Sequence, residues 1–180
     1  MSEITSTADA LETVRKVRQV RQYLPGDVSD EQLIQLLEIA RWTGSSRNTQ
    51  AWRFVVVRDK DTLKQLSDLR ENITWVADAA LAIGLVSPGQ NPPHEAYDEG
   101  RVTERIMIGA AMLGLGAGTA WFGEPEREAK AKALLNVPEG STLRSVVAIG
   151  PFETSDDPRP TGPKPGRKPL SELVHYEKMS

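Results

Sequence analysis

Four short apolar runs, separated by stretches with helical spacing, constrain the fold of this chain most strongly. Each run has the length and composition of a buried strand; they cover residues 53–58, 79–86, 117–122 and 143–149. Helices are expected over residues 8–20, from Ser29 onward, and over 59–69, 95–115 and 125–135. Helices that alternate with strands around a small apolar sheet indicate an α+β or α/β sandwich. The 180 residues show no internal repeat, so we expect one domain.

Local signals support these boundaries. The first amphipathic helix, Ala8 to Val20, has a basic C-terminal end, and Ser29 with Gln32 forms the pattern of a capping box at the start of the next helix. The uncharged run from Ile106 to Gly123 approaches the length of a membrane span, but it contains five glycines. We interpret it as a buried helix followed by a buried strand, and expect no membrane association.

Composition excludes several functional classes. The net charge of −3 with mixed signs gives no reason to expect nucleic acid as a partner. The chain has no cysteine and only two histidines, which argues against a thiolate nucleophile or a metal site. The acidic residues that follow His94 fit an ordinary helix N-terminus better than a metal site. The first five residues lack the basic and then apolar order of a signal peptide, so we expect a cytoplasmic protein.

The segment Gly44–Phe54, GSSRNTQAWRF, places hydroxyl, amide and guanidinium groups on a turn that leads into a strand. This donor set suits a planar, polar, anionic cofactor. The segment resembles the Ser-Ser-x-Asn-x-Gln-x-Trp-x-Phe element of the FMN-dependent nitroreductase family, with Gly44 and Ala51 where that family usually has proline. The resemblance implies an α+β, three-layer sandwich with a small mixed sheet flanked by helices and an extended C-terminal arm.

In that family a basic pattern followed by an aromatic residue binds the flavin phosphate. Here Val17-Arg18-Gln19-Val20-Arg21-Gln22-Tyr23 is similar to it, and the resemblance assigns Arg18, Gln19 and Arg21 to FMN. Val17 and Gln19 stand where the family has arginine and serine, which changes two phosphate contacts. Near the C-terminus, Gly166-Arg167-Lys168-Pro169-Leu170 resembles the family's last basic element, and Arg167 is assigned to the same phosphate.

The resemblance also implies partners for the flavin ring. Asn72 stands where the family has a flavin-binding asparagine, although a surface turn explains it equally well. Trp121, Phe122 and Gly123 resemble the segment that runs beneath the flavin and presents main-chain amides to it. Ser45, Ser46 and Asn48 would reach the flavin of the other subunit, because this family forms homodimers with active sites at the interface.

Flavin chemistry requires little of side chains, so we assign no protein general acid or base. The expected reaction is two-electron hydride transfer from NADH or NADPH, through FMN, to a nitroaromatic, quinone or similar small-molecule acceptor. Arg47 is hypothesised to attract an acidic acceptor or the 2′-phosphate of NADPH. The alternatives are a non-catalytic flavin-binding or storage protein, and a deazaflavin-using or flavin-reducing member.

The C-terminal tail differs from the rest of the chain. Six of the nineteen residues from Pro151 to Pro169 are proline, which favours extended chain. Leu170, Leu173, Val174 and Tyr176 then form an apolar end. We therefore divide the chain into an FMN-binding, nitroreductase-like domain at residues 1–150 and an arm at residues 151–180, which packs on the partner subunit or is disordered.

Overall fold

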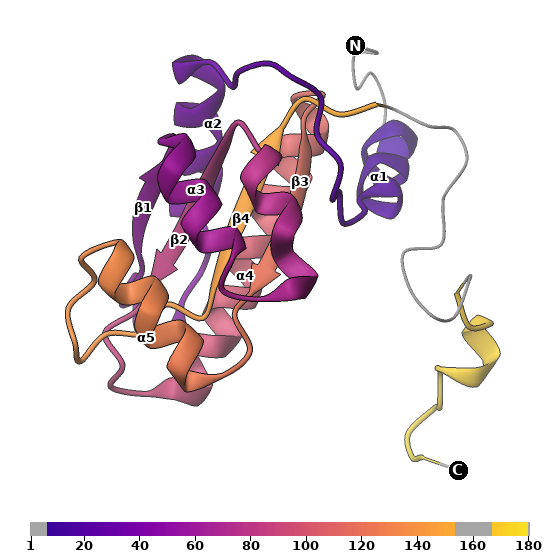
Figure 1. Cartoon of the computed structure of the whole chain (residues 1–180). Helices are drawn as coiled ribbons and strands as arrows, with labels where there is room; N and C mark the ends of the chain where they lie inside the picture. The colour runs from indigo at the N-terminus through magenta and orange to yellow at the C-terminus, as the bar shows by residue number, and fades with distance from the viewer. Residues whose placement is uncertain (1–6, 154–166, 180) are drawn as a thin grey trace.

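The structure, a computed structural model, describes residues 7–153 and 167–179, and is organised around a four-stranded sheet (Figure 1). The strands are β1 (Arg53–Val57), β2 (Leu81–Val86), β3 (Gly116–Trp121) and β4 (Ser145–Gly150). The α-helices are α1 (Thr7–Lys16), α2 (Asp30–Arg41), α3 (Lys60–Ser67), α4 (Pro92–Met112) and α5 (Pro125–Leu134). Three short 3₁₀ helices complete the set: η1 (Ser46–Asn48), η2 (Glu71–Asp78) and η3 (Leu170–Glu172). The expected sandwich is confirmed.

The strand order is β1-β2-β4-β3, and all three neighbouring pairs are antiparallel. The expectation of a mixed sheet is therefore wrong for the described residues. The reason lies in the connections: α3 and η2 pack against each other between β1 and β2, so the chain returns to the end of the sheet that it left. This order makes β1 and β3 the two edges of the sheet.

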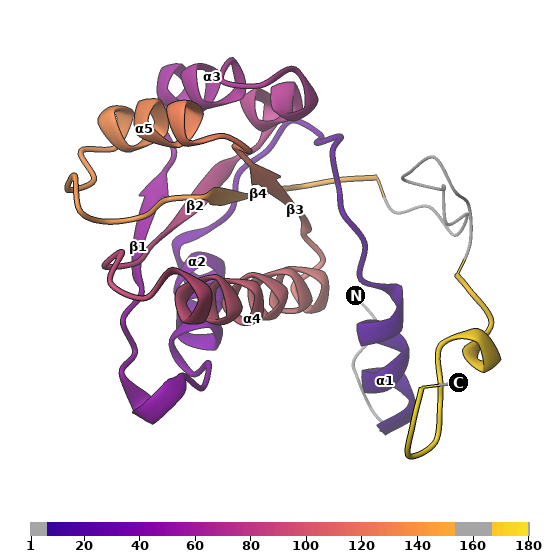
Figure 2. The same ribbon diagram turned by 90° about the horizontal axis from the view of Figure 1, so that it is seen from below.

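Helices cover both faces of the sheet (Figure 2): α2 and α4 lie on one face, and α3 and α5 on the other. Side chains of the central strands alternate between the two cores, as strand geometry requires. Leu81, Ile83 and Leu85 of β2 pack in the α2/α4 core, whereas Ala82 and Val86 pack in the α3/α5 core. All six residues of β2 are buried, which explains why its sequence is apolar throughout.

Local sequence signals predict one helix boundary correctly and another wrongly. The capping box of α2 is present: the Ser29 hydroxyl accepts from the Gln32 amide, and the Gln32 side chain accepts from the Ser29 amide. By contrast, α1 ends at Lys16, four residues before the expected Val20. The following residues leave the helix because the Val20 amide donates to the Ala117 carbonyl of β3, at 2.9 Å. A tertiary contact thus overrides helical periodicity.

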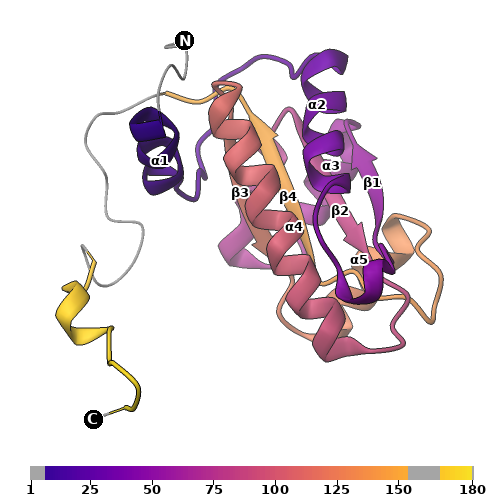
Figure 3. The same ribbon diagram turned by 180° about the vertical axis from the view of Figure 1, so that it is seen from behind.

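Two segments lie outside the sandwich, on its β3 side (Figure 3): helix α1 and the C-terminal segment 167–179. Their large apolar side chains are exposed, including Leu11 of α1 at 61% and Leu170 and Tyr176 at 74% and 82%. Most of the arm expected at 151–180, namely residues 154–166, lies outside the described residues. The apolar end of the arm therefore has no cover within the described chain.

Candidate functional site

The outer edge of β3 carries the first group of site residues. The segment that follows α1 runs along this edge, where the Gln19 side-chain amide donates to the Thr119 carbonyl at 2.6 Å. The main chains approach so closely that a Cβ on Gly118 would stand 2.2 Å from the Val20 carbonyl oxygen. Gly118 is therefore needed to bring the basic segment, with Arg18 and Arg21, to the strand.

The 3₁₀ helix η2 lies beside the same edge, although the sequence patterns did not indicate it. Trp75 is the contact: its ring comes within 3.0 Å of the position of a Cβ on Gly118, and its indole N–H donates to the Asn72 carbonyl at 2.9 Å. Tyr23 stacks obliquely on Trp75, with ring centroids 6.4 Å apart. The side chain of Asn72 is exposed at this place, which is compatible with its expected role.

Tyr23 anchors the segment that follows α1 to the sheet. Its hydroxyl donates to the Ala148 carbonyl of β4 at 2.8 Å. Burial raises the pKa of the phenol above its usual range, and the nearby Arg21 guanidinium only partly opposes this effect. The phenol is therefore a neutral hydrogen-bond donor that anchors the basic segment to the sheet.

The end of β3 holds the second group. Trp121 is 53% exposed, and Gly123 turns the chain with a φ of +93°, a conformation that favours glycine. Phe122 differs from both: its ring is fully buried and its amide donates to the Arg144 carbonyl at 3.0 Å. Phe122 therefore supports the turn from the core, and Trp121 and Gly123 are the members of the expected set that face outward.

Arg70 is a residue of this site that sequence reasoning missed. Its guanidinium donates to the Trp121 carbonyl at 3.1 Å and lies 5.4 Å from the centroid of the Trp121 ring. A Cβ on Gly123 would stand 3.3 Å from Arg70 Nη1 and 3.5 Å from Arg127 Nη1. Only its place two residues before Asn72 could have drawn attention to Arg70, because a single arginine in a loop is no signal by itself.

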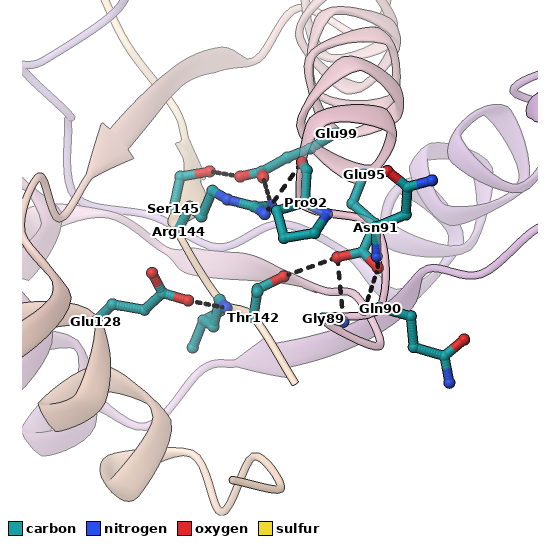
Figure 4. A network of polar contacts seen from close by, with 11 residues as sticks. Gly89, Gln90, Asn91, Pro92, Glu95, Glu99, Glu128, Thr142, Arg144 and Ser145 are labelled. Carbon is teal, nitrogen blue, oxygen red and sulfur yellow. Dashed lines mark hydrogen bonds and ion pairs between the residues drawn. The ribbon is translucent and has the colours of Figure 1, made fainter. Parts of the chain in front are cut away.

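A shallow depression of about 290 Å³ lies between α4 and the outer ends of β3 and β4. It is lined by Ala96, Glu99, Gly100, Thr103, Thr119, Trp121, Arg144 and Ser145. Glu99 organises its floor (Figure 4): its carboxylate pairs with Arg144 at 3.0 Å and accepts from the Ser145 hydroxyl at 2.6 Å. Because each of these groups has a partner, the floor is a rigid, polar support beside Trp121.

A second carboxylate holds the turn before α4 (Figure 4). The buried Glu95 side chain accepts from the amides of Gly89, Gln90 and Asn91, at 2.9–3.1 Å. Glu128 of α5 accepts in the same way from the Leu143 amide at 2.8 Å. These acids satisfy buried backbone donors, and the described residues contain no cluster of acids and histidines that could hold a metal ion.

The loop that carries Ser45, Ser46 and Asn48 lies elsewhere. It precedes β1, the edge strand opposite β3. Arg47, Asn48 and Gln50 all have positive φ, at 53°, 56° and 46°, and the Gln50 amide donates to the Ser45 hydroxyl at 2.9 Å. Non-glycine residues in the left-handed region store strain, and such residues cluster at ligand-binding sites.

Helix α4 fixes the start of this loop. Arg105 donates to the Trp42 carbonyl at 2.7 Å, and a Cβ on Gly44 would stand 2.9 Å from the Arg101 guanidinium. The side chains of Ser46, Arg47 and Asn48 are exposed. Within one chain, therefore, the loop is presented outward from the α2/α4 side, and its polar groups do not meet the β3 edge.

The three expected phosphate ligands are not assembled in a single chain. The Arg18 guanidinium turns back to the carbonyls of Arg15 and Val17, and Arg21 is exposed. Arg167 belongs to the C-terminal segment 167–179, and that segment lies away from the sheet (Figure 1). In the part of the chain that the structure covers, no helix is long and apolar enough to cross a membrane.

The donors present still fit a flavin nucleotide. Amide, indole and guanidinium groups, some exposed and some half-buried, surround the Gly118–Gly123 stretch, and the turn at Gly123 leaves a space that a Cβ would fill. Such a combination of flat aromatic surface, amide edge and cations matches a planar heterocycle with an anionic tail.

Comparison with known proteins agrees with this geometry. The Nitroreductase family model matches residues 14–88. A putative NADH dehydrogenase/NAD(P)H nitroreductase of Archaeoglobus fulgidus is 32% identical over 149 residues, covering 79% of this chain and 84% of the relative. A protein of the same description from Methanothermobacter thermautotrophicus is 28% identical, with 81% and 78% covered. A solved structure from Parabacteroides distasonis has a TM-score of 0.83 at 21% identity, covering 94% of this chain and 98% of that one.

Proposed function

Because the chain belongs to the nitroreductase family, we propose that it is an FMN-dependent NAD(P)H oxidoreductase that reduces nitroaromatic, quinone or similar acceptors. The observation that supports this function best is the β3 edge, where Gln19, Asn72, Trp121 and Gly123 lie along one glycine-lined strand. Helicobacter pylori and Bacillus subtilis relatives are described as an oxygen-insensitive NADPH nitroreductase and an FMN reductase, which agrees with this donor and cofactor.

When bound, FMN supplies the hydride chemistry, and the described residues hold and orient it. Asn72 presents its exposed amide to the flavin, and half-buried Gln19, whose side-chain N–H donates to Thr119, presents its amide oxygen. Trp121 presents a flat ring, and Gly123 leaves the backbone approachable. Arg18, Arg21 and Arg167 are proposed for the phosphate. The Glu99–Arg144 pair lines the same depression as Trp121, and we propose that its fixed charges keep this part of the site ordered as the flavin charge changes.

We propose that the working unit is a homodimer, because a single chain presents the two halves of the site at opposite edges of the sheet. Ser45, Ser46 and Asn48 stand before β1, whereas the flavin-facing residues lie at β3. In a two-fold dimer each loop can reach the β3 edge of the other subunit. The positive-φ residues then hold the loop in the shape that projects its amides and hydroxyls.

The division of the chain is part of the same proposal. Residues 1–150 form the FMN-binding domain, and the arm at 151–180 packs on the partner subunit. The exposed side chains of Leu170, Leu173 and Tyr176, together with Leu11 of α1, support this packing, because large exposed apolar side chains that gather in one region are typical of an interaction surface. We propose the cytoplasm as the location, since the electron donor is a metabolite of that compartment.

Arg47 is proposed to bind the acceptor. Its side chain is exposed on the strained loop, and no carboxylate pairs with it among the described residues. A guanidinium in this position attracts acceptors that carry a carboxylate or a sulfonate.

The first test is the absorbance spectrum of the purified protein, before and after anaerobic addition of NADH and then NADPH. Flavin bands that either nucleotide bleaches are expected. Bands that persist with both nucleotides would instead indicate a non-catalytic flavin-binding protein or a different reductant. A colourless protein that FMN cannot reconstitute would refute the flavin assignment.

Mixed dimers test the shared site. One variant combines Ser46→Ala with Asn48→Ala, and the other carries Gln19→Ala with Asn72→Ala. Each variant alone has both sites damaged, but a mixed dimer contains one intact site, so random exchange restores about a quarter of the native sites. Activity that stays at the level of the separate variants, despite verified exchange, would contradict a site shared between subunits.

A further inference from the structure

We propose that Arg70 raises the reduction potential of the bound flavin, because its guanidinium is a fixed positive charge where two flavin-binding elements meet. The inference rests on the proposed function and deepens it, since it names a residue that makes the flavin a better hydride acceptor. Arg70 lies against both residues at the end of β3 that are proposed for the flavin, Trp121 and Gly123.

Arg70 connects η2 to the end of β3. It is the N-cap residue of η2, where its carbonyl accepts from the Ile73 amide at 3.0 Å. Its guanidinium donates to the Trp121 carbonyl at 3.1 Å. Because η2 carries Asn72 and β3 ends at Trp121, one side chain links the two elements that are proposed to hold the flavin ring.

The contacts of the guanidinium fix its place. Its central carbon lies 5.4 Å from the centroid of the Trp121 ring, within the range of a cation–π interaction. Its Nη1 atom lies 3.3 Å from the position of a Cβ on Gly123. The side chain is half-buried, so water and salt screen its charge less than they screen a charge on the open surface. Arg70 is therefore a positioning residue for Trp121 and, at the same time, a cation that stays at the Gly123 turn.

No carboxylate of the described residues neutralises this cation. Arg70 donates only to the Trp121 carbonyl, and Glu71, the next residue along the chain, is exposed and forms no ion pair with it. Arg127 adds a second positive charge, with its Nη1 atom 3.5 Å from the same Cβ position. Its partner Glu124 is exposed and 3.6 Å away, and such a surface pair is weak. The charge at the turn is therefore positive.

Hydride transfer makes this charge consequential. Hydride carries two electrons and one proton, so a neutral flavin that accepts it from a nicotinamide gains one negative charge, and the nicotinamide gains one positive charge. A fixed cation beside the flavin therefore stabilises the reduced form more than the oxidised form. A close opposite charge commonly shifts such an equilibrium by about tenfold or more, and partial exposure weakens the effect, so we expect about threefold to tenfold for Arg70.

The test is the midpoint potential of the FMN-loaded protein, measured against a reference dye while xanthine oxidase reduces both. Neither a nicotinamide nor an acceptor is needed, so the measurement does not depend on turnover. In a two-electron couple a tenfold change equals about 30 mV, so Arg70→Gln should lower the potential by about 15–30 mV. Arg70→Lys keeps the charge but loses the planar fork, and should retain at least half of the native effect.

Arg41→Gln is the matched control. Arg41 also lies over a tryptophan ring, at 5.2 Å from the Trp42 centroid, but it pairs with Glu38 at the end of α2. Its loss should leave the potential at the native value. Salt gives a second control, because the screening length falls to about 3 Å at 1 M ionic strength. The difference between the native protein and Arg70→Gln should therefore shrink at high salt.

Affinity separates the charge of Arg70 from its mechanical support of Trp121. A purely mechanical role would weaken the binding of oxidised and reduced FMN equally and leave the potential unchanged. We expect instead that Arg70→Gln raises the Kd of reduced FMN about threefold to tenfold more than the Kd of oxidised FMN. The proposal is overturned if Arg70→Gln keeps the native potential, or if Arg70→Lys lowers the potential as far as Arg70→Gln does.

These outcomes are distinct from failure of the proposed function. If a nicotinamide nucleotide bleaches the flavin but Arg70→Gln leaves the potential unchanged, only the role of Arg70 is refuted. If the potential falls as expected but neither nucleotide bleaches the flavin, the oxidoreductase assignment is refuted and the role of Arg70 stands. A native protein that binds no FMN refutes both.

Discussion

Gly118→Ala is the substitution that most directly tests how the site is built. By intrinsic preference alone, alanine in a strand interior is favoured over glycine by about 0.5–1 kcal/mol. The structure predicts the opposite sign. The new Cβ would stand 2.2 Å from the Val20 carbonyl oxygen and 3.0 Å from the Trp75 ring, whereas ordinary contacts begin at 3.4 Å.

The molecule has two ways to relieve this contact. β3 and its neighbours can shift, at the cost of about 1–3 kcal/mol that overpacking commonly has. Alternatively, the segment that follows α1 detaches from β3 and loses the Val20–Ala117 and Gln19–Thr119 hydrogen bonds, which are worth about 0.5–1.5 kcal/mol each. The cheaper response costs about 1–3 kcal/mol, and the intrinsic preference for alanine offsets part of it, so we expect a net loss of about 0.5–2 kcal/mol in the free energy of unfolding.

Both responses displace the segment that carries Arg18 and Gln19, so FMN affinity should also fall, by about tenfold for each 1.4 kcal/mol of binding free energy lost. Urea denaturation measures the first effect, and quenching of FMN fluorescence measures the second. Gly140→Ala is the control, because no atom lies within 4 Å of its added Cβ and its φ is not positive. Its stability should stay within about 0.5 kcal/mol of the native value.

The result that refutes this reasoning is a Gly118→Ala protein with native or higher stability and an unchanged FMN dissociation constant. Should the variant fail to fold, Gln19→Ala removes one of the same contacts without a steric clash. That variant should lose about 0.5–1.5 kcal/mol in stability and also bind FMN more weakly.

Three further substitutions test other parts of the structure. Arg47→Ala should raise the KM for a carboxylated nitroaromatic acceptor several-fold and leave that for an uncharged one unchanged; equal effects on both would contradict its role. Glu95→Ala leaves the three buried amides of residues 89–91 without their acceptor, so urea denaturation should show a loss of about 2–4 kcal/mol. Burial raises the pKa of Tyr23 in the folded state above its usual 10.0. The stability linked to it is therefore full below pH 10 and declines as pH rises further, and Tyr23→Phe should remove that decline from alkaline denaturation curves.

The sequence was sufficient to predict the elements whose signals are local. The strands could be located because buried strands read as apolar runs, and the capping box of Ser29 and Gln32 could be predicted because its two hydrogen bonds join residues three apart. The loop before β1 was recognisable from its amides and hydroxyls. The left-handed conformation of Arg47, Asn48 and Gln50 in this loop could not be predicted, because only asparagine among these residue types tolerates it well.

What could not be predicted depends on contacts between distant residues. Helical periodicity continues through Val20, but a hydrogen bond to Ala117 ends the helix at Lys16. The antiparallel sheet follows from the packing of η2 on α3, which returns the chain to the end of the sheet that it left, and η2 is a 3₁₀ helix with a kink at Ile73, which α-helical periodicity does not predict. Arg70 became visible only through its contacts with Trp121 and Gly123. In each case the deciding partner lies far along the chain.

The same distant contacts explain why the two proposed halves of the site lie apart within one chain. The strand order places β1 and β3 at opposite edges, so the loop before β1 cannot approach the β3 edge without crossing the sheet. That loop is nevertheless held in a costly shape: three residues lie in the left-handed region, and Thr43 at its base has a buried hydroxyl with no partner in the described chain. Arg101 and Arg105 of α4 hold the loop where it leaves α2. A strained and braced loop that meets no other site residue among those the structure describes supports the proposal that it serves the flavin of a second subunit.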